Sequence, residues 1–356
     1  MKIYINSRFL TQRTTGVQRF AIEIAKSIAS IDKKIIFIAP KNILHDDIAK
    51  TINIQCFGNL KGHLWEQLEL PFYSRDGLLL NLCNTGPVFH RNSITVMHDA
   101  AVFSKPGGFS PQFKLVYRFL LPWLAKRSKK TITVSNFSKN ELGYFCKINP
   151  SRIEVISESG AHIKKYTPDI EILKKNNLRS KKYILAVSSL NPNKNFQSVA
   201  SALKLIDENL IKDIDFAIVG GQNTACFSGN KTNSPVKASK YLGYVTDEEL
   251  KALYENAFCF IYPSLYEGFG LPPLEAMECG CPVLCSNAAS LPEVCGDAVL
   301  YFDPYQPENI ADKLELFINH PELRNELVEK GKTRTHQFTW EKSAEQVINI
   351  IKSLKN

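Results

Sequence analysis

The sequence lacks the features that mark several large classes of protein. No stretch of its 356 residues approaches the roughly 18 uncharged apolar residues that a membrane span requires. The apolar run at the N-terminus ends at Arg8, too early for a secretory signal. With 44% hydrophobic and 22% charged residues, the composition excludes intrinsic disorder and a collagen-like repeat. A cytoplasmic globular protein is the expectation, and at roughly 100–200 residues per domain the length predicts two domains.

Common metal and nucleotide motifs are also missing. The nine cysteines include no paired Cys-x-x-Cys units, and the loose group of four between Cys279 and Cys295 overlaps an apolar strand. Reduced thiols and no zinc site are therefore expected. No Gly-x-Gly-x-x-Gly follows the first apolar strand, which argues against a nicotinamide-dependent dehydrogenase. A P-loop ending at residues 331–333 would need glycine where Glu326 stands.

The net charge of +9 is unevenly distributed. Residues 1–165 carry 24 Lys and Arg against 11 Asp and Glu, whereas residues 166–356 carry 20 against 24. This asymmetry supports two units with different partners. A basic half attracts nucleic acid, anionic lipid or a phosphorylated substrate, and charge alone does not choose among them.

Apolar segments with the length of strands alternate with segments of helical periodicity. Strands are predicted at 2–6, 35–39, 78–82, 94–97, 131–135, 153–157, 183–188, 216–219, 241–245, 259–264 and 282–286. Helices are predicted at 17–30, 111–126, 136–146, 196–208, 247–256 and 273–279, and the tail from residue 307 is mostly helical. This alternation predicts two consecutive α/β parallel sheets, with the polar segment 158–182 as linker. Ligands of such sheets bind at the carboxyl ends of the strands, so the loops there should carry the chemistry.

The most informative segment, residues 262–277, reads YPSLYEGFGLPPLEAM. An apolar strand enters a loop in which Gly268 and Gly270 permit close approach of a ligand. The backbone N–H groups at the following helix start favour an anion. Glu267 and Glu275 flank this loop, and carboxylates beside an anion site suit neutral hydroxyl groups such as those of a sugar or ribose. The alternative is a structural turn with surface glutamates.

This arrangement of Glu267 and Glu275 resembles the signature of glycosyltransferase family 4, retaining enzymes of the GT-B fold that use nucleotide-sugar donors. Segments that are similar in the same order are 16–20, 96–99, 134–138, 185–195, 241–245 and 338–341. The resemblance therefore covers nearly the whole chain. It implies an acceptor-side domain at 1–165, a donor-binding domain at 166–339, and a final helix at 340–356 that packs back on the first.

The resemblance implies a role for each residue of the donor loops. Glu267 would hold hydroxyls of the donor sugar, Glu275 would accept from the ribose hydroxyls, and Lys194 would neutralise the diphosphate. The backbone that would hold the sugar and the diphosphate is that of Gly268, Phe269, Gly270 and Leu271. The loop that would line the nucleobase is Gly243, Tyr244 and Val245.

In the first half, Gly16 would let its loop approach the phosphates and the acceptor, and His98 would contact the sugar or phosphate beside the scissile bond. A structural, hydrogen-bonded His98 is the alternative. The pattern is closest to bacterial mannosyltransferase-like members of O-antigen and polysaccharide biosynthesis. The implied reaction moves a hexosyl group, with GDP-mannose as the first donor to test, to a glycan or polyprenyl-diphosphate-linked glycan with retention of configuration.

Breaking a sugar–phosphate bond builds negative charge on the leaving diphosphate, which cations and helix N-termini stabilise. No cofactor and no metal are expected, because residues 213–215 (Asp-Ile-Asp) fit a solvated turn better than a metal motif. One feature departs from the family, which often has Arg before the lysine where this chain has Asn193. The residues hypothesised to compensate are Arg8, Arg13 and Arg19.

Residues 111–130 read PQFKLVYRFLLPWLAKRSKK, a basic amphipathic pattern with aromatics that is typical of a membrane-surface helix. The alternative is a core helix followed by a solvated charge run, and Pro122 should kink or end the helix. Together with the basic first half, this pattern favours peripheral contact with an anionic membrane surface, at the inner face of the cytoplasmic membrane.

Two other functions stay open at this point. A nucleotide-sugar epimerase of similar architecture would give product from donor alone. A basic nucleic-acid-binding protein would explain the charge but not the two glutamates at a glycine-bearing helix start, and no nucleic-acid partner is expected.

Overall fold

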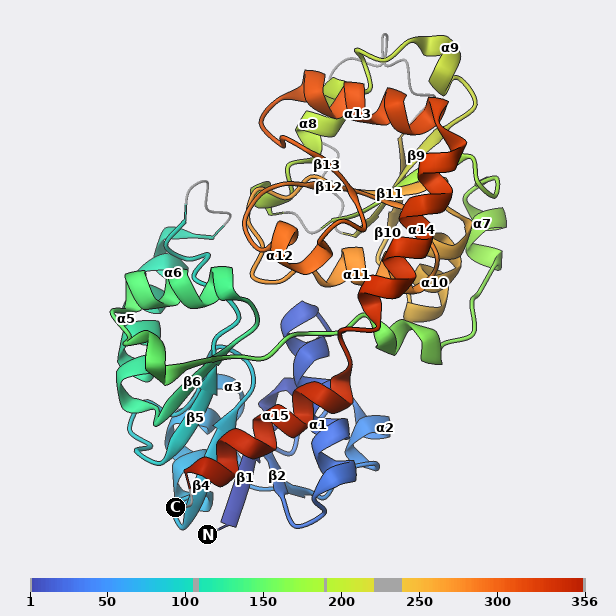
Figure 1. Ribbon diagram of the computed structural model, residues 1–356. Coiled ribbons are helices and arrows are strands. Elements are labelled where there is room, and N and C mark those ends of the chain that lie inside the picture. Colours follow the sequence, from blue (N-terminus) through green and yellow to red (C-terminus); the bar gives the residue numbers. More distant parts are fainter. Residues whose placement is uncertain (1, 105–108, 189–190, 221–238, 355–356) are drawn as a thin grey trace. The chain divides into compact units, whose positions relative to one another are not determined.

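The computed structural model describes residues 2–104, 109–188, 191–220 and 239–354, which form two compact units (Figure 1). Unit 1 comprises residues 2–104, 109–158 and 339–354, and unit 2 comprises the described parts of 159–338. The chain therefore passes between the units after Glu158 and again after Phe338.

Unit 1 is built on a parallel sheet that, within the described residues, has seven strands in the order β3-β2-β1-β4-β5-β6-β7. The strands are β1 (Lys2–Asn6), β2 (Ile36–Ala39), β3 (Ile54–Cys56), β4 (Gly77–Asn81), β5 (Ser93–Val96), β6 (Lys130–Thr133) and β7 (Ile153–Val155). The central strand β4 reads Gly-Leu-Leu-Leu-Asn and is buried throughout. Such continuous apolar runs are typical of parallel strands covered on both faces.

Helices cover this sheet and include one from the end of the chain. The helices of unit 1 are α1 (Gly16–Ile31), α2 (Asp46–Ala49), α3 (Gly62–Leu64), α4 (Leu70–Tyr73), α5 (Pro111–Arg127), α6 (Asn136–Cys146) and α15 (Trp340–Ser353). A π-helical turn, η2 (Trp65–Glu69), joins α3 to α4. Helix α15 packs on α1, where the rings of Trp340 and Phe20 lie 6.0 Å apart (Figure 1).

Helix α5 continues through Pro122 to Arg127, although proline was expected to kink or end it. Leu121 and Leu124, on either side of the proline, are buried. The hydrogen bond that closes the last turn is intact, because the Ser128 N–H donates to the carbonyl of Leu124 at 2.8 Å. Tertiary packing thus outweighs the local cost of the proline.

Unit 2 contains a second parallel sheet, which in the part of the chain that is described has six strands in the order β10-β9-β8-β11-β12-β13. The strands are β8 (Tyr183–Ser188), β9 (Asp215–Gly220), β10 (Lys240–Gly243), β11 (Cys259–Tyr262), β12 (Val283–Ser286) and β13 (Leu300–Phe302). The helices are α7 (Glu171–Lys175), α8 (Phe196–Ala202), α9 (Glu208–Ile211), α10 (Asp247–Asn256), α11 (Leu271–Glu278), α12 (Leu291–Cys295), α13 (Pro307–Asn319) and α14 (Pro321–Thr335).

The sequence pattern predicted eleven of the thirteen described strands, including the edge strands β7 and β10, and missed the edge strands β3 and β13. The two missed strands have three residues each, too few to show periodicity, whereas the equally short β7 lies in the longer apolar segment 153–157. The predicted helix 196–208 is also divided, because the Asp207 side chain accepts from the Asn209 N–H and starts α9 as a separate turn. Within the predicted linker, residues 161–165 form a 3-10 turn, η4 (Ala161–Lys165), and α7 follows.

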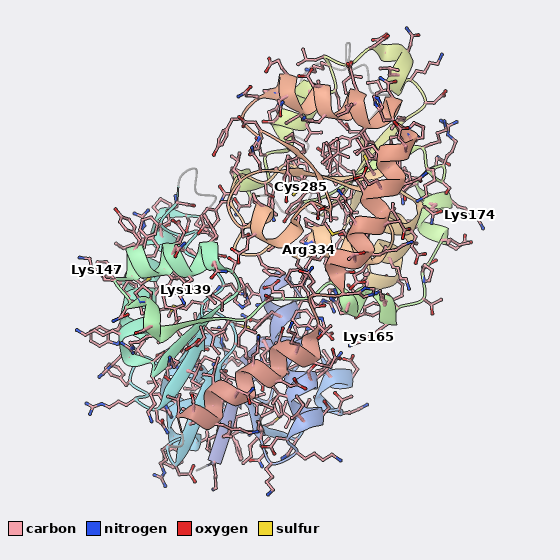
Figure 2. All side chains as sticks on the ribbon, viewed as in Figure 1. Lys139, Lys147, Lys165, Lys174, Cys285 and Arg334 are labelled. Carbon is pink, nitrogen blue, oxygen red and sulfur yellow. The ribbon has the colours of Figure 1, made fainter. Side chains whose placement is uncertain are left out.

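Side chains divide between interior and surface as the composition suggests. Figure 2 shows Cys285 inside unit 2, where it is fully buried in β12, whereas Lys147, Lys165 and Lys174 are exposed. The eight cysteines among the described residues are free thiols. No helix in the described part of the chain combines the length and apolarity needed to cross a bilayer.

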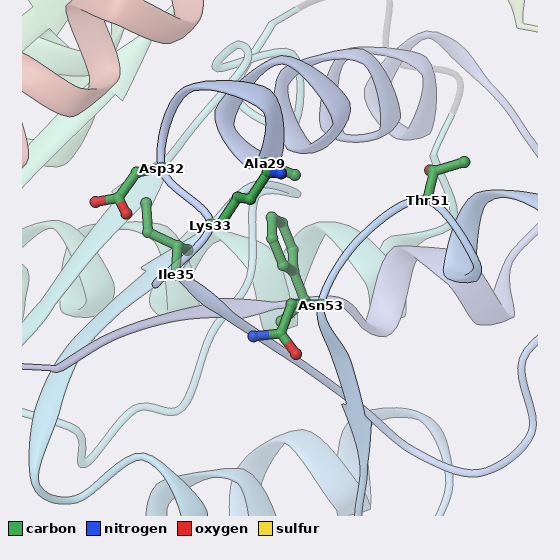
Figure 3. Close-up of a pocket in the computed structure, with 7 residues that line it drawn as sticks. Ala29, Asp32, Lys33, Ile35, Thr51 and Asn53 are labelled. Atoms are coloured by element: carbon green, nitrogen blue, oxygen red, sulfur yellow. The ribbon is translucent and has the colours of Figure 1, made fainter.

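A hollow of about 190 Å³ lies in unit 1 beside the end of α1 and the start of β2 (Figure 3). Asp32, Lys33, Ile35 and Asn53 are among its lining residues. It opens at the amino ends of the strands, the edge opposite to the one where ligands of parallel sheets bind. The candidate site must therefore be sought at the other edge.

Candidate functional site

The loops that follow β8 and β11 carry the predicted donor residues of unit 2. These strands are neighbours in the sheet, so their carboxyl ends emerge side by side. The N–H of Leu265 donates to the carbonyl of Asn193 at 2.7 Å, which ties the two loops together. Asn195 has a left-handed backbone (φ 51°) and turns the first loop into α8.

Lys194 and Glu267 meet at this point. The Lys194 Nζ donates to Glu267 Oε1 at 2.6 Å and to the Tyr262 hydroxyl at 2.8 Å, and Tyr262 in turn donates to Glu267 Oε1 at 2.8 Å. The side chains of Lys194 and Glu267 are 20% and 15% exposed. A cation and a carboxylate thus lie together at a partly open position.

Tyr262 is a member of this cluster to which the sequence pattern assigned no role. It is the last residue of β11 and is buried. Burial and the neighbouring Glu267 raise the pKa of Tyr262 far above its usual value, so it stays a neutral donor. Its place at the end of the strand that enters the glycine loop was the only available signal.

The backbone of the glycine loop is held in one conformation. Gly270 has φ +119°, and a Cβ there would meet the Leu291 side chain at 2.7 Å, so only glycine fits. The Ser290 Oγ lies 2.9 Å from the carbonyl of Glu267 and 2.6 Å from that of Phe269. Ser290 is a second residue that sequence reasoning missed.

The first turn of α11 offers fewer donors than the sequence interpretation assumed. Pro272 and Pro273 occupy this turn and have no N–H groups. Of the first three residues of α11, Leu271 alone has a backbone N–H group. Phe269 and Leu271 are buried, and the Phe269 ring packs edge-on to Phe338 with centroids 5.8 Å apart. These two residues therefore offer a ligand their backbone and not their side chains.

Glu275 lies in a separate cluster on α11. Its Oε2 accepts from the Tyr254 hydroxyl at 3.1 Å, and its Oε1 lies 3.0 Å from His162 Nε2. His162 Nδ1 is 3.3 Å from the carbonyl of Ser159. Gly160 allows this turn to approach α11, because a Cβ there would meet the Leu274 backbone at 2.6 Å. Glu275 is 7% exposed, so its oxygens are largely engaged within the protein.

A row of three buried aromatic rings connects the two glutamate clusters. The Tyr254 and Phe260 rings are 5.4 Å apart, and those of Phe260 and Tyr262 are 5.7 Å apart. Tyr254 donates to Glu275 at one end and Tyr262 to Glu267 at the other. The two carboxylates are therefore held at opposite ends of one row of packed rings, contributed by α10 and β11.

The predicted nucleobase loop follows β10. Gly243 ends the strand with φ +70°, Tyr244 is 80% exposed and Val245 is buried.

His98 and Gly16 belong to unit 1. His98 is buried after β5, with Nδ1 3.2 Å from Glu158 Oε1 and Nε2 3.1 Å from the carbonyl of Leu82. Both ring nitrogens thus face acceptors, and the Phe20 ring packs edge-on to the imidazole at 4.9 Å. Gly16 begins α1 with open space around it, since a Cβ there would meet nothing within 4 Å.

The arginines expected to compensate for Asn193 differ in their environments. Arg8 is buried and its Nε donates to Glu66 Oε1 at 3.0 Å, so its charge is engaged within unit 1. Arg13 is exposed, and Arg19 is half-buried. Arg13 is thus the most solvent-accessible of the three.

The acidic residues of the Asp-Ile-Asp segment face different cations. Asp215 pairs with Lys240 at 2.9 Å, whereas Asp213 lies 3.8 Å from Arg179. In the described residues no group of three or more His, Cys, Asp and Glu side chains is arranged to hold a metal ion.

Comparison with known proteins places this geometry in context. The family model described as "Glycosyl transferases group 1" matches residues 169–334, which lie in unit 2. The O-antigen chain mannosyltransferase B of Escherichia coli is 32% identical over 281 residues, which cover 76% of this chain and 74% of that protein. The O-antigen chain mannosyltransferase RfbU of Salmonella typhimurium is 32% identical over 224 residues, covering 62% of this chain and 59% of that protein.

The chain belongs to the glycosyltransferase group 1 family. Anabaena HepE, solved in complex with UDP-glucose, superposes with a TM-score of 0.75 at 17% identity over 99% of this chain and 100% of that one. The fold is therefore GT-B, as the sequence predicted. Family membership identifies the chain as a hexosyltransferase and favours that activity over the epimerase and nucleic-acid-binding alternatives.

Proposed function

We propose that this glycosyltransferase moves a hexosyl group from a nucleoside-diphosphate sugar, with GDP-mannose as the first donor to test, to a glycan or polyprenyl-diphosphate-linked glycan hydroxyl. The observation that carries the proposal is the Lys194–Glu267 pair at the carboxyl ends of β8 and β11. Two mannosyltransferase relatives at 32% identity support the choice of sugar.

The proposed roles follow from the charges at the site. As the sugar–phosphate bond breaks, negative charge grows on the diphosphate, and Lys194 with the amides of residues 268–271 stabilises it. Glu267 accepts hydrogen bonds from sugar hydroxyls, while Glu275 accepts from the ribose. Because Lys194 and Glu267 bind each other in the free protein, the donor inserts between them or shares them. The reaction proceeds with retention and without a metal ion, since protein cations supply the charge.

The remaining predicted residues have supporting roles. Gly16 lets the start of α1 approach the phosphates and the acceptor, and Arg13 adds a second cation. His98 contacts the sugar or phosphate after exchanging one of its two present partners, Glu158 or the carbonyl of Leu82. The loop Gly243–Tyr244–Val245 lines the nucleobase, for which the exposed Tyr244 ring is available for stacking.

The donor is tested by thermal shift with GDP, UDP and dTDP and with their hexose conjugates. One nucleoside diphosphate should raise the unfolding temperature well above the other two, by an amount that grows with its concentration. Lys194→Ala should abolish that shift, whereas Lys332→Ala on α14 should leave it intact. Equal responses to all three nucleotides, or none at all, would overturn the proposed donor.

The surface of α5 supports contact with an anionic membrane at the cytoplasmic face. Leu115, Val116, Phe119 and Trp123 are exposed there, and the Arg127 guanidinium lies 5.3 Å from the Trp123 ring. Interfacial helices combine such apolar and basic side chains. In a flotation assay at low salt, the protein should float with vesicles that contain anionic lipid. The double variant with Phe119→Ser and Trp123→Ser should float with these vesicles in a smaller fraction. Absence of lipid-dependent binding would remove this partner.

A further inference from the structure

A buried charge pair, Arg8 with Glu66, lies in unit 1 and is engaged within that unit. Glu66 is 1% exposed, and its Oε1 accepts from Asn6 Nδ2 at 2.8 Å, Arg8 Nε at 3.0 Å and Thr85 Oγ1 at 3.2 Å. Replacing buried ion pairs by well-packed apolar residues is often neutral or stabilising. Stability alone therefore does not explain why this buried cluster is charged.

The cluster lies at the edge of the sheet where ligands bind. Asn6 is the last residue of β1 and Asn81 the last of β4, and the Asn6 amide donates to Asn81 Oδ1 at 3.0 Å. These strands are adjacent and parallel, so their carboxyl ends meet here. Glu66 itself comes from the π-helical turn η2, and such turns occur frequently at functional sites.

His63 connects the buried carboxylate to the surface. Its Nδ1 lies 3.3 Å from Glu66 Oε2, and its side chain is 58% exposed while that of Glu66 is 1% exposed. A carboxylate partner at Nδ1 favours the tautomer with the proton on that nitrogen. The other nitrogen, Nε2, is then an acceptor held in a fixed orientation, suited to a hydroxyl group of a ligand.

We propose that His63, oriented by Glu66, binds a hydroxyl of the acceptor sugar, with Glu66 and Arg8 as positioning residues. This inference rests on the proposed function. A transferase needs a carbohydrate site for the acceptor besides the site for the donor, and in unit 1 the cluster of His63, Glu66 and Arg8 has no part in the proposed function. Leu64 and Leu68, 64% and 65% exposed on the same helical segment, suit an acceptor that has an aliphatic tail.

Acceptor binding is tested without a donor. Octyl α-D-mannopyranoside, a sugar with an aliphatic tail, is titrated against the full chain and followed by saturation-transfer NMR. His63→Ala should weaken binding by about tenfold or more, as expected for loss of a hydrogen bond to an oriented group. His336→Ala, which removes an exposed histidine of unit 2, should bind like the unchanged protein. Equal affinities for all three proteins, or no saturable binding by the unchanged protein, would overturn the inference.

The positioning role of Glu66 is tested by Glu66→Gln, which keeps the size of the side chain and removes its charge. With GDP-mannose as donor, the ratio of transfer to donor hydrolysis should fall by about tenfold, through the KM for the acceptor. A purely structural role would change the unfolding temperature and leave this ratio unaltered. If Glu66→Gln does not fold, the His63→Ala binding result decides.

The two proposals fail in different ways. If octyl mannoside binds at His63 but no nucleoside-diphosphate sugar is turned over, the proposed function fails and the carbohydrate site stands. If donor is turned over normally while His63→Ala transfers to the acceptor as well as His336→Ala does, the inference about His63 fails and the function stands.

Discussion

Glu267 and Glu275 are eight residues apart in the chain yet bind two different tyrosine hydroxyls, those of Tyr262 at 2.8 Å and Tyr254 at 3.1 Å. Glu267 also pairs with Lys194, whereas Glu275 lies against His162. The two carboxylates are thus held in separate environments, which supports a division of labour between sugar and ribose.

Glu275→Gln should therefore weaken nucleoside-diphosphate binding by about tenfold, because a charged acceptor for hydroxyl groups is lost. Glu267→Gln should mainly lower kcat, since in the proposed function Glu267 binds hydroxyls of the reacting sugar. Calorimetric titration and steady-state rates measure the two effects, with the exposed Glu329→Gln as control. Identical effects of the two changes on affinity and kcat would contradict this division.

Tyr262→Phe should lower kcat about tenfold with little change in donor KM, because Lys194 and Glu267 lose the hydroxyl that holds them together. Tyr183→Phe is a matched control in the same sheet. Tyr183 is also fully buried and donates one hydrogen bond, to the carbonyl of Leu253 at 2.6 Å. It should cost about 1 kcal/mol of stability and leave kcat unaltered. Equal kcat in both variants would show that the Tyr262 hydroxyl has no positioning role.

Gly16→Ala should raise the donor KM severalfold at an unaltered unfolding temperature, because the added Cβ meets nothing within 4 Å in the free protein. Gly160→Ala should instead lower the unfolding temperature by about 5 °C, since its Cβ would collide with the backbone of Leu274. Thermal unfolding and donor kinetics separate these outcomes. A stable Gly16→Ala variant with unchanged kinetics would remove Gly16 from the phosphate site.

Arg13→Ala should raise the donor KM by about fivefold to tenfold if this exposed guanidinium replaces the missing cation beside Lys194. Lys147→Ala removes another exposed cation of unit 1, at the end of α6, and should leave KM unchanged (Figure 2). The KM of the Arg13 variant should also depend less on ionic strength than that of the unchanged protein. Identical kinetics for both variants would show that Arg13 does not replace the cation that is missing at Asn193.

The stability of unit 1 should depend on acid through Glu66. Burial by itself would raise the pKa of Glu66, but the hydrogen bond from His63, the charge of Arg8 and the hydrogen bond from Asn6 outweigh it and hold the pKa below 4.5. Its contribution to stability is therefore complete above about pH 4.5 and is lost as the pH falls through the lower folded-state value. Unfolding temperatures measured from pH 6 to pH 3 should fall less steeply for Glu66→Gln. If the unfolding temperatures of the two proteins fell in parallel with pH, Glu66 would not be the source of this acid dependence.

The sequence by itself determined the two parallel sheets and the donor loop. Apolar strands that alternate with amphipathic helices specify a sheet because each segment must bury its apolar face, and this information is local. The glycines, prolines and glutamates of residues 266–277 are likewise close together in the chain, so their pattern can be recognised from the sequence. The sequence also predicted that Lys194 and Glu267 lie on loops at strand ends. That β8 and β11 are neighbours, so that the two side chains meet, came from the structure.

Only the tertiary structure decided which polar groups share a partner. Tyr262 and Ser290 carry no distinctive local pattern, and their roles follow from distances to groups in other loops. Glu66 likewise carried no signal in the sequence, because its partners Asn6, Arg8 and Thr85 lie at or after the ends of two strands far from it in the chain. A hydrogen bond needs its two atoms within about 3 Å, and for residues far apart in sequence only the folded chain sets that separation.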